Sequence, residues 1–411
     1  MPILKLHLEN IGPFDKLELD LTDGNGKAHL GPHILAGVNG SGKSTVLRAI
    51  AASLAIGGVA NSGFDEFEWE AFVGDRYANV RIPVLGHTEL SWNNLPEGVL
   101  MNKRAIESLG CIAAYAPRPV LRRIAQPPTG YQSGLRENSL AFEQSVTNEG
   151  VQSFWIHAFL REAVLKNGER AKHAVKALRQ VVSQTLGEEF QPGINVDESF
   201  AQPVVRFRGN EVTFSQLAAG ISATLGWTVD YLLRRESFPW PNGVSAENGP
   251  GLIMIDEIET HLHPQWQRRI LNGIRAAFPN TQIIVTTHSP FVVSSCTGAR
   301  LHLFKLDDSG KSSLDESIDA PDSASISANI MDVFGIRSEF SLSIEQKLDR
   351  WNDLKRRRST GRLSAEETSE LKSLIDELAA KGEELSSIVA EPPVLPQSII
   401  DELVSSVNKH R

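Results

Sequence analysis

The amino-acid sequence predicts an α/β fold whose central strands end at one ligand-binding edge. Three apolar runs carry this prediction, because each is followed at once by residues of the kinds that bind phosphate or metal. They are residues 33–36, 251–255 and 282–287 in a chain of 411 residues. Continuous apolar strands of this type are usually buried on both faces of a parallel sheet, and ligands bind outside their carboxyl ends.

The first run leads into residues 37–45, Gly-Val-Asn-Gly-Ser-Gly-Lys-Ser-Thr, which fit the phosphate-binding pattern G-x-x-x-x-G-K-[ST] in full. The apolar residues 46–51 that follow predict a helix leaving the loop. Glycines let backbone N–H groups turn toward phosphates, and the helix N-terminus adds partial positive charge. A Gly-rich turn with an incidental Lys-Ser is the alternative, and the flanking strand and helix argue against it.

The residues of this loop have expected roles in binding a nucleotide. The residues expected to bind the phosphates of a nucleotide are Gly37, Asn39, Gly40, Ser41, Gly42, Lys43, Ser44 and Thr45. Lys43 is expected to reach the β- and γ-phosphates, and the Ser44 hydroxyl to ligate Mg²⁺.

The other two runs end in the side chains that phosphate chemistry needs. Asp256 and Glu257 follow the second run. We expect Asp256 to hold Mg²⁺, directly or through water, and Glu257 to polarise the water that attacks the γ-phosphate. An acidic pair after a strand also occurs as a simple helix N-cap. The third run ends in His288, which is expected to reach the γ-phosphate.

Together these motifs resemble the ATP-binding-cassette (ABC) ATPases, in the branch that holds RecF, Rad50 and SMC proteins. Residues 4–14 look like the first strand of that branch, and residues 287–290, Thr-His-Ser-Pro, look like its switch strand. Residues 256–267, Asp-Glu-Ile-Glu-Thr-His-Leu-His-Pro-Gln-Trp-Gln, closely resemble the Walker B extension of OLD-like and bacterial anti-phage defence ATPases. The resemblance implies an ABC-type P-loop ATPase head with a mixed central sheet, a helical insertion lobe and a helical C-terminal tail.

The resemblance also implies ATP hydrolysis with Mg²⁺ at a dimer interface, with Glu257 and His288 as catalytic residues. The partner subunit would supply a signature segment, for which Leu217, Ala218 and Gly220 are the candidates. Relatives place a Ser where this chain has Ala218, and a Ser hydroxyl bond to phosphate contributes about 1.5–3 kcal/mol. Its loss would affect turnover more than binding, since the Gly220 N–H and the helix N-terminus remain. An ordinary amphipathic helix is the alternative for this segment.

His261 and His263 form a His-x-His pair of the kind found in zinc sites. Zinc needs three or four ligands, and no Cys lies nearby in the sequence. In the resembling family this context belongs to the ATPase motif. The pair is therefore expected to shape the loop that crosses to the partner's site, and Glu259 could share that role.

Composition predicts a cytoplasmic protein of two or three packed units, since 41% of residues are hydrophobic and 22% charged. No apolar run approaches 20 residues, so no membrane span is expected, and the start lacks a signal-peptide pattern. Cys111 and Cys296 are expected to be buried free thiols. The net charge of −9 argues against a uniformly basic nucleic-acid binder, but it is compatible with a local basic groove on DNA.

Four regions are predicted: residues 1–135 and 201–306 as the two halves of the ATPase lobe, 136–200 as the helical insertion and 307–411 as the helical C-terminal region. The first half should contain short antiparallel strands near residues 81–92 and a core strand from Cys111. The family's Mg²⁺-sensing Gln has two candidate positions, Gln126 and Arg118. Helical periodicity runs from about Gln144 to Leu186.

The C-terminal region is expected to begin with a loop at residues 307–313 and then form amphipathic helices. Two sets of apolar residues should each share a helix face: Ile344, Leu348, Trp351 and Leu354, and Leu371, Leu374, Ile375 and Leu378. Residues 355–358, Lys-Arg-Arg-Arg, either contact a phosphate backbone or form a solvated helix end. Residues 391–396 predict a stiff, Pro-rich connector.

The chain lacks the Glu and Asp-x-Asp arrangement of the OLD nuclease module after His288, and it lacks an HNH signature. If it serves a defence system, the cutting chemistry should therefore lie in a separate partner, as in Septu-type systems and some retrons. The expected partners are a second copy of this chain and such a nuclease. Two other functions remain open: a RecF-like repair ATPase acting on DNA, and a nucleotide-gated scaffold with little turnover.

Overall fold

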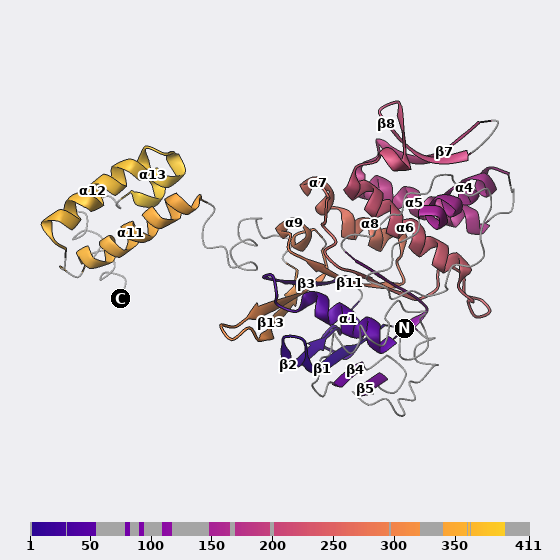
Figure 1. The fold of residues 1–411 in the computed structure, drawn as a ribbon, viewed down its shortest axis with the longest axis horizontal. Helices are drawn as coiled ribbons and strands as arrows, with labels where there is room; N and C mark the ends of the chain where they lie inside the picture. The colour runs from indigo at the N-terminus through magenta and orange to yellow at the C-terminus, as the bar shows by residue number, and fades with distance from the viewer. Residues whose placement is uncertain are drawn as a thin grey trace, which may run out of the picture. The chain divides into compact units, whose positions relative to one another are not determined.

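The computed structural model describes most of the chain as two compact units, residues 1–335 and 336–411 (Figure 1). The described residues are 2–29, 31–54, 79–82, 90–93, 109–116, 148–164, 169–197, 201–295, 297–320, 340–359, 361 and 363–390. The predictions for Arg118, Gln126, Cys296 and the connector 391–396 lie outside these residues. No helix in the described part is long and apolar enough to cross a membrane.

A six-stranded sheet forms the centre of the first unit. Its strands are, in spatial order, β13 (Ser312–Asp319), β12 (Arg300–Leu306), β3 (His33–Gly37), β11 (Thr281–Thr287), β10 (Gly251–Ile255) and β6 (Cys111–Tyr115). β12, β3, β11, β10 and β6 run parallel, and β13 is antiparallel to β12. The predicted mixed central sheet and its three site-bearing strands are confirmed.

Side chains alternate between the two faces of this sheet, and both faces are buried. In β10, Ile253 and Ile255 belong to one hydrophobic cluster, whereas Leu252 and Met254 belong to the other. Burial on both faces explains why the strand reads as a continuous apolar run in the sequence. The sheet is thus the middle layer of the unit.

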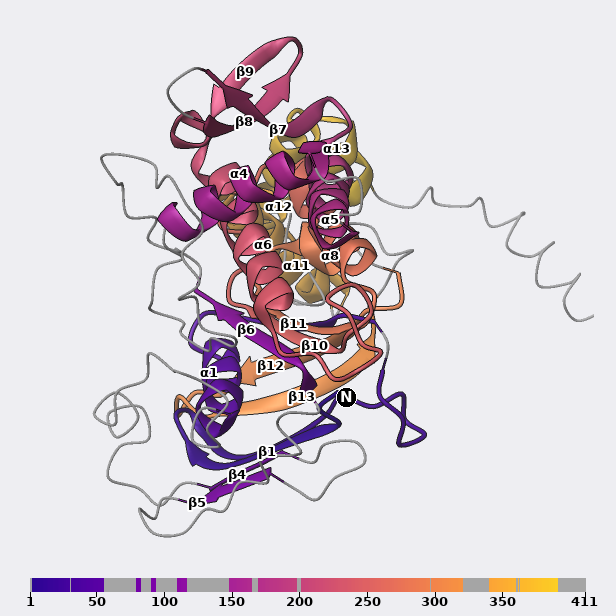
Figure 2. The same cartoon turned by 90° about the vertical axis from the view of Figure 1, so that its right-hand side faces the viewer.

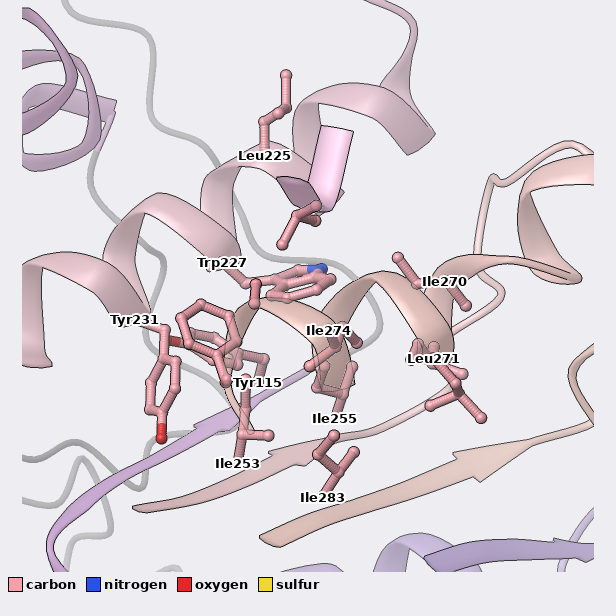
Figure 3. Close-up of a cluster of buried hydrophobic side chains, with 14 of the residues drawn as sticks. Tyr115, Leu225, Trp227, Tyr231, Ile253, Ile255, Ile270, Leu271, Ile274 and Ile283 are labelled. Atoms are coloured by element: carbon pink, nitrogen blue, oxygen red, sulfur yellow. The ribbon is translucent and has the colours of Figure 1, made fainter. Parts of the chain in front are cut away.

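Helices cover the first face and extend beyond it. Apart from α1 (Lys43–Leu54) on the other face, the helical segments among the described residues of the first unit are α4 (Asn148–Val164), α5 (Glu169–Leu186), η2 (Phe214–Gln216), α6 (Ala219–Ser237), α7 (Pro264–Gln267), α8 (Ile270–Ala277) and α9 (Pro290–Val293). Figure 3 shows Trp227 of α6 and Ile274 of α8 packing over Ile255 and Ile283 of the sheet. Trp155 of α4 joins the same cluster, so the predicted insertion helices share the core of the ATPase lobe.

The second face carries α1 and a four-stranded antiparallel sheet (Figure 2). That sheet has the order β2 (Phe14–Asp20), β1 (Lys5–Ile11), β4 (Asn79–Ile82) and β5 (Leu90–Asn93). The pairing of β4 with β5 confirms the antiparallel strands predicted near residues 81–92.

A further sheet lies beyond the helices of the first face (Figure 2) and was not predicted. It consists of β7 (Phe190–Val196), β8 (Ala201–Phe207) and β9 (Asn210–Thr213). Since β7 falls within residues 136–200, the insertion is not wholly helical.

β13 extends the central sheet to Asp319, past the predicted boundary at residues 306/307. β13 pairs with β12 from Leu306↔Ser312 to Arg300↔Asp319, and the N–H of Ser312 donates to the carbonyl of Pro13 at 2.9 Å. Only Leu314 and Ile318 in this strand are apolar, as suits an edge strand with one solvated face. Because the strand is mostly polar, its sequence did not predict a strand.

The described residues of the second unit form α11 (Leu342–Ser359), α12 (Ala365–Ala379) and α13 (Glu383–Val389), in agreement with the amphipathic helices predicted there. They bury their own core, in which both predicted apolar faces take part. Of the basic residues at the end of α11, Lys355 lies over the Trp351 ring at 4.4 Å, and Arg357 pairs with Glu367 at 2.5 Å. These two contacts favour the solvated helix end.

Candidate nucleotide-binding site

The carboxyl edge of the central sheet gathers the predicted phosphate site, since β3, β11 and β10 are neighbours and end together. The loop after β3 needs its glycines. Gly42 has φ +84°, and a Cβ there would lie 2.4 Å from the Phe14 ring. A Cβ on Gly37 would lie 2.4 Å from the carbonyl oxygen of Phe304. Only glycine fits these positions, so the backbone of the loop is left open to a ligand.

Lys43 opens helix α1 and is only 4% exposed. Its Nζ donates to the carbonyl oxygens of Gly37 (3.0 Å) and Val38 (2.9 Å), and to Ser41 Oγ at 3.4 Å. Burial lowers the pKa of Lys43 to about 8, against the opposing effect of nearby carboxylates, Asp256 first. The ammonium is thus held over the loop by oxygen atoms that phosphate oxygens can replace.

Asp256, which follows β10, links the phosphate loop to β11. Its Oδ1 accepts from Ser44 Oγ at 2.8 Å and from Thr286 Oγ1 at 2.5 Å. A hydroxyl oxygen and a carboxylate oxygen at this separation are ligands that Mg²⁺ prefers. The residues present therefore fit a magnesium ion, and Ser44 and Asp256 would hold it.

Glu257 has a left-handed backbone, with φ +46°. Its N–H donates to Thr286 Oγ1 at 2.7 Å, and its Oε2 accepts from Thr260 Oγ1 at 3.3 Å. A left-handed non-Gly residue costs on the order of 1–3 kcal/mol, and such residues cluster at functional sites. The turn leaves the Glu257 carboxylate half-buried, one residue after Asp256.

His288 follows β11 and is half-buried beside the same groups. Burial lowers the pKa of His288, and the Lys43 ammonium lowers it further, while Glu257 and Asp256 act in the opposite direction. The imidazole is therefore neutral at neutral pH and can donate one N–H bond to an anion.

The candidate signature residues lie at the start of α6. Ala218 is the N-cap of this 19-residue helix, is exposed and makes no side-chain capping bond. Leu217 packs against the core of the unit, and a Cβ on Gly220 would lie 2.2 Å from the carbonyl oxygen of His261. Within this chain the segment therefore packs on the loop that follows Glu259.

His261 and His263 have structural roles in the described chain. His261 adopts φ +64° in the turn, and His263 Nδ1 accepts from the N–H of Gln265 at the start of α7. Among the residues that the structure describes, no three His, Cys, Asp or Glu side chains are placed to hold a metal ion.

Sequence reasoning missed the hydroxyl groups that organise the site. Thr286 orients Asp256 and Glu257. Thr287 donates to Glu259, and Ser289 donates to Gln267. The available signal was the pair of threonines that ends β11 directly after the apolar residues 283–285, where apolar residues would suffice for burial.

The sheet order, the phosphate loop after β3 and the acidic residues after β10 define an α/β P-loop ATPase fold. The predicted fold class is confirmed. Two family models match parts of the chain. One, described as "AAA domain, putative AbiEii toxin, Type IV TA system", matches residues 157–294, and one described as "AAA domain" matches residues 5–76.

Among curated proteins, the chain is similar to the Retron Ec83 probable ATPase of Escherichia coli. The two are 40% identical over 98 residues, which cover 23% of this chain and 18% of that protein. The Septu protein PtuA of Bacillus thuringiensis is 24% identical over 310 residues, covering 71% of this chain and 73% of that one. The predicted resemblance to Septu-type and retron-associated ATPases is confirmed, although the match spans less than a fifth of the retron proteins.

Among solved structures, one similar chain is described as the SMC head bound to the C-winged helix domain of ScpA. It is 13% identical, covers 79% of this chain and 100% of that one, and gives a TM-score of 0.43.

Proposed function

We propose that this chain binds and hydrolyses ATP, closes around the nucleotide into dimers or larger assemblies, and regulates a separate nuclease in anti-phage defence. The observation that carries the ATPase proposal is the hydrogen-bonded group of Ser44, Asp256 and Thr286 beside Lys43. Similarity to retron and Septu proteins supports the role in defence.

In the proposed reaction, Lys43 and the loop N–H groups bind the phosphates, and Ser44 and Asp256 hold Mg²⁺. The metal would neutralise charge on the β- and γ-phosphate oxygens. Glu257 orients a water molecule and accepts its proton as the oxygen attacks the γ-phosphorus and the bond to ADP breaks. Neutral His288 donates to a γ-phosphate oxygen. Leu217, Ala218 and Gly220 of a second copy would close the site from the other side.

The test is ATP turnover together with mass in solution, with Mg²⁺ and ATP, for wild type and Glu257→Gln. Removing the water-orienting carboxylate should lower kcat by about 100-fold or more while ATP stays bound and dimers accumulate. Glu247→Gln, on an exposed loop, is the matched control and should change neither quantity. Wild-type turnover in Glu257→Gln would refute the assignment.

A second candidate, a nucleotide-gated scaffold, is favoured by Ala218, which brings no hydroxyl to the exposed start of α6. In that case ATP would hold an assembly together, and nucleotide depletion would release its partner. Tight ATP binding in a stable oligomer, with almost no turnover in wild type, would identify this function.

The regulated partner can be sought next to the gene that encodes this chain. We expect a nuclease there whose activity differs between its complexes with wild type and with Glu257→Gln. A neighbour that binds neither form would contradict the regulatory part of the proposal and leave the ATPase part standing.

A further inference from the structure

Glu259 connects the turn after β10 to the residue that follows β11. Its Oε1 accepts from the backbone N–H of His288 at 2.5 Å, and its Oε2 accepts from Thr287 Oγ1 at 2.7 Å. Both oxygen atoms of one carboxylate therefore accept from two consecutive residues, and one of these is His288, whose imidazole bonds the backbone of Gly37 in the phosphate loop.

A second side chain fastens the same two segments. Gln267 Oε1 accepts from Ser289 Oγ at 2.6 Å, and Gln267 Nε2 donates to the carbonyl of Leu262 at 2.8 Å. Ser289 is the N-cap of α9, and its Oγ accepts hydrogen bonds from the first N–H groups of that helix. The contact between Ser289 and Gln267 therefore has a local structural purpose. Glu259 caps no helix and forms no ion pair in the described chain, although its carboxylate also bonds its own backbone N–H and acts on the charge of Lys43.

The carboxylate is held there at a cost. Burial raises the pKa of Glu259, with the bonds from His288 and Thr287 opposing the rise. An apolar residue would avoid that cost, but it would leave the His288 N–H and the Thr287 hydroxyl without this acceptor. What the carboxylate provides is a fixed backbone at His288.

From this geometry we infer that Glu259 is a positioning residue, whose carboxylate fixes the His288 backbone and thereby places the imidazole at the γ-phosphate. The inference rests on the proposed ATPase function, and it assigns to Glu259 a role within its own subunit. A displacement of about 1 Å in a reacting group can lower a rate about 100-fold, so a fixed backbone at this residue matters for catalysis.

Four variants test this role: Glu259→Ala, Glu259→Gln, His288→Ala and the double variant Glu259→Ala/His288→Ala. Glu259→Ala should lower kcat by about 10- to 100-fold with KM changed less than about threefold, since Lys43 and the loop are intact. Glu259→Gln should recover most of the rate, because an amide oxygen can accept from His288 N–H and its NH₂ can donate to Thr287.

The double variant separates positioning from a general structural effect. If Glu259 acts through His288, the double variant should have the kcat of His288→Ala alone, because the imidazole is already absent. Losses that multiply would overturn the inference. Glu162→Ala, which removes a carboxylate whose two oxygen atoms both accept from Arg179, is the control for loss of a doubly bonded carboxylate away from the site.

If wild type has negligible ATP turnover, nucleotide-binding measurements test the role of Glu259 instead. Glu259→Ala and His288→Ala should then lose the same share of the wild-type preference for ATP over ADP, measured with fluorescent analogues of both nucleotides. An unchanged preference in Glu259→Ala with a reduced one in His288→Ala would overturn the inference. If wild type bound neither nucleotide, the proposed function would fail first, and the inference with it.

Discussion

The two halves of the proposed ATP site are built in different ways. The phosphate-loop half is tied together by side chains, with Ser44, Thr286 and Asp256 sharing one carboxylate oxygen and Lys43 held by loop carbonyls. The signature half, around Ala218, is the exposed start of a helix and has only backbone N–H groups and a helix dipole to offer.

This difference separates affinity from turnover. A group that is already ordered loses little conformational freedom when the ligand arrives, so the first half should supply most of the binding energy. In the proposed dimer the second half would contribute only when two copies close, and without a serine hydroxyl it would stabilise the γ-phosphate less. We therefore expect tight ATP binding combined with slow hydrolysis.

The largest expected effect comes from breaking the first half with Lys43→Ala. Losing the ammonium removes charge-assisted bonds to two phosphates, each contributing about 1.5–3 kcal/mol, so ATP affinity should fall by more than about 100-fold. Titration calorimetry measures this, with the melting temperature of the unliganded variant as the check on folding. Affinity within a few-fold of wild type would show that the loop N–H groups alone hold the nucleotide.

Ala218→Ser should strengthen the weaker half. If the proposed dimer forms, a serine hydroxyl at the start of α6 would lie at the γ-phosphate of the partner's nucleotide, and we expect a rise in kcat of about tenfold with little change in ATP affinity. Ala219→Ser, one residue along the same exposed turn, is the matched control and should leave kcat unchanged. Equal effects of both substitutions would mean that Ala218 holds no special position.

A smaller effect should appear in the pH dependence of ATP binding. The pKa of Lys43 is lowered to about 8 by burial, and bound phosphates would raise it again. Binding is then linked to proton uptake above pH 8, so affinity should be constant below that pH and fall by about fivefold between pH 8 and 9. The terminal phosphate is already ionised in this range. Flat affinity from pH 7 to 9.5 would show that Lys43 stays charged throughout.

Much of this architecture could be read from the sequence because its signals are local. Residues 33–45 and 251–257 each combine an apolar strand with the polar residues that follow it, and burial on both faces makes such strands conspicuous. The contacts of Glu259 with Thr287 and His288 could not be read in the same way. They join residues almost 30 positions apart, and no local pattern distinguishes a carboxylate that crosses to another strand from one that faces solvent.

Two of the strands that were not predicted, β13 and β7, have a different cause. Both lie at sheet edges and bury few of their side chains, so polar residues are tolerated in them. Their patterns resemble loops, and only pairing with β12 and β8 identifies them as strands.

The close contact between Gly220 and His261 bears on how this sequence can diverge. Any side chain at residue 220 would meet the carbonyl of residue 261, so selection for folding alone should preserve that glycine even in a chain that never touched a nucleotide. Ala218 is exposed, so folding does not restrict its side chain in this way and residue 218 can change with the catalytic requirement. A survey of natural variants should therefore find residue 220 almost fixed, with serine at residue 218 appearing and disappearing as catalytic demand changes.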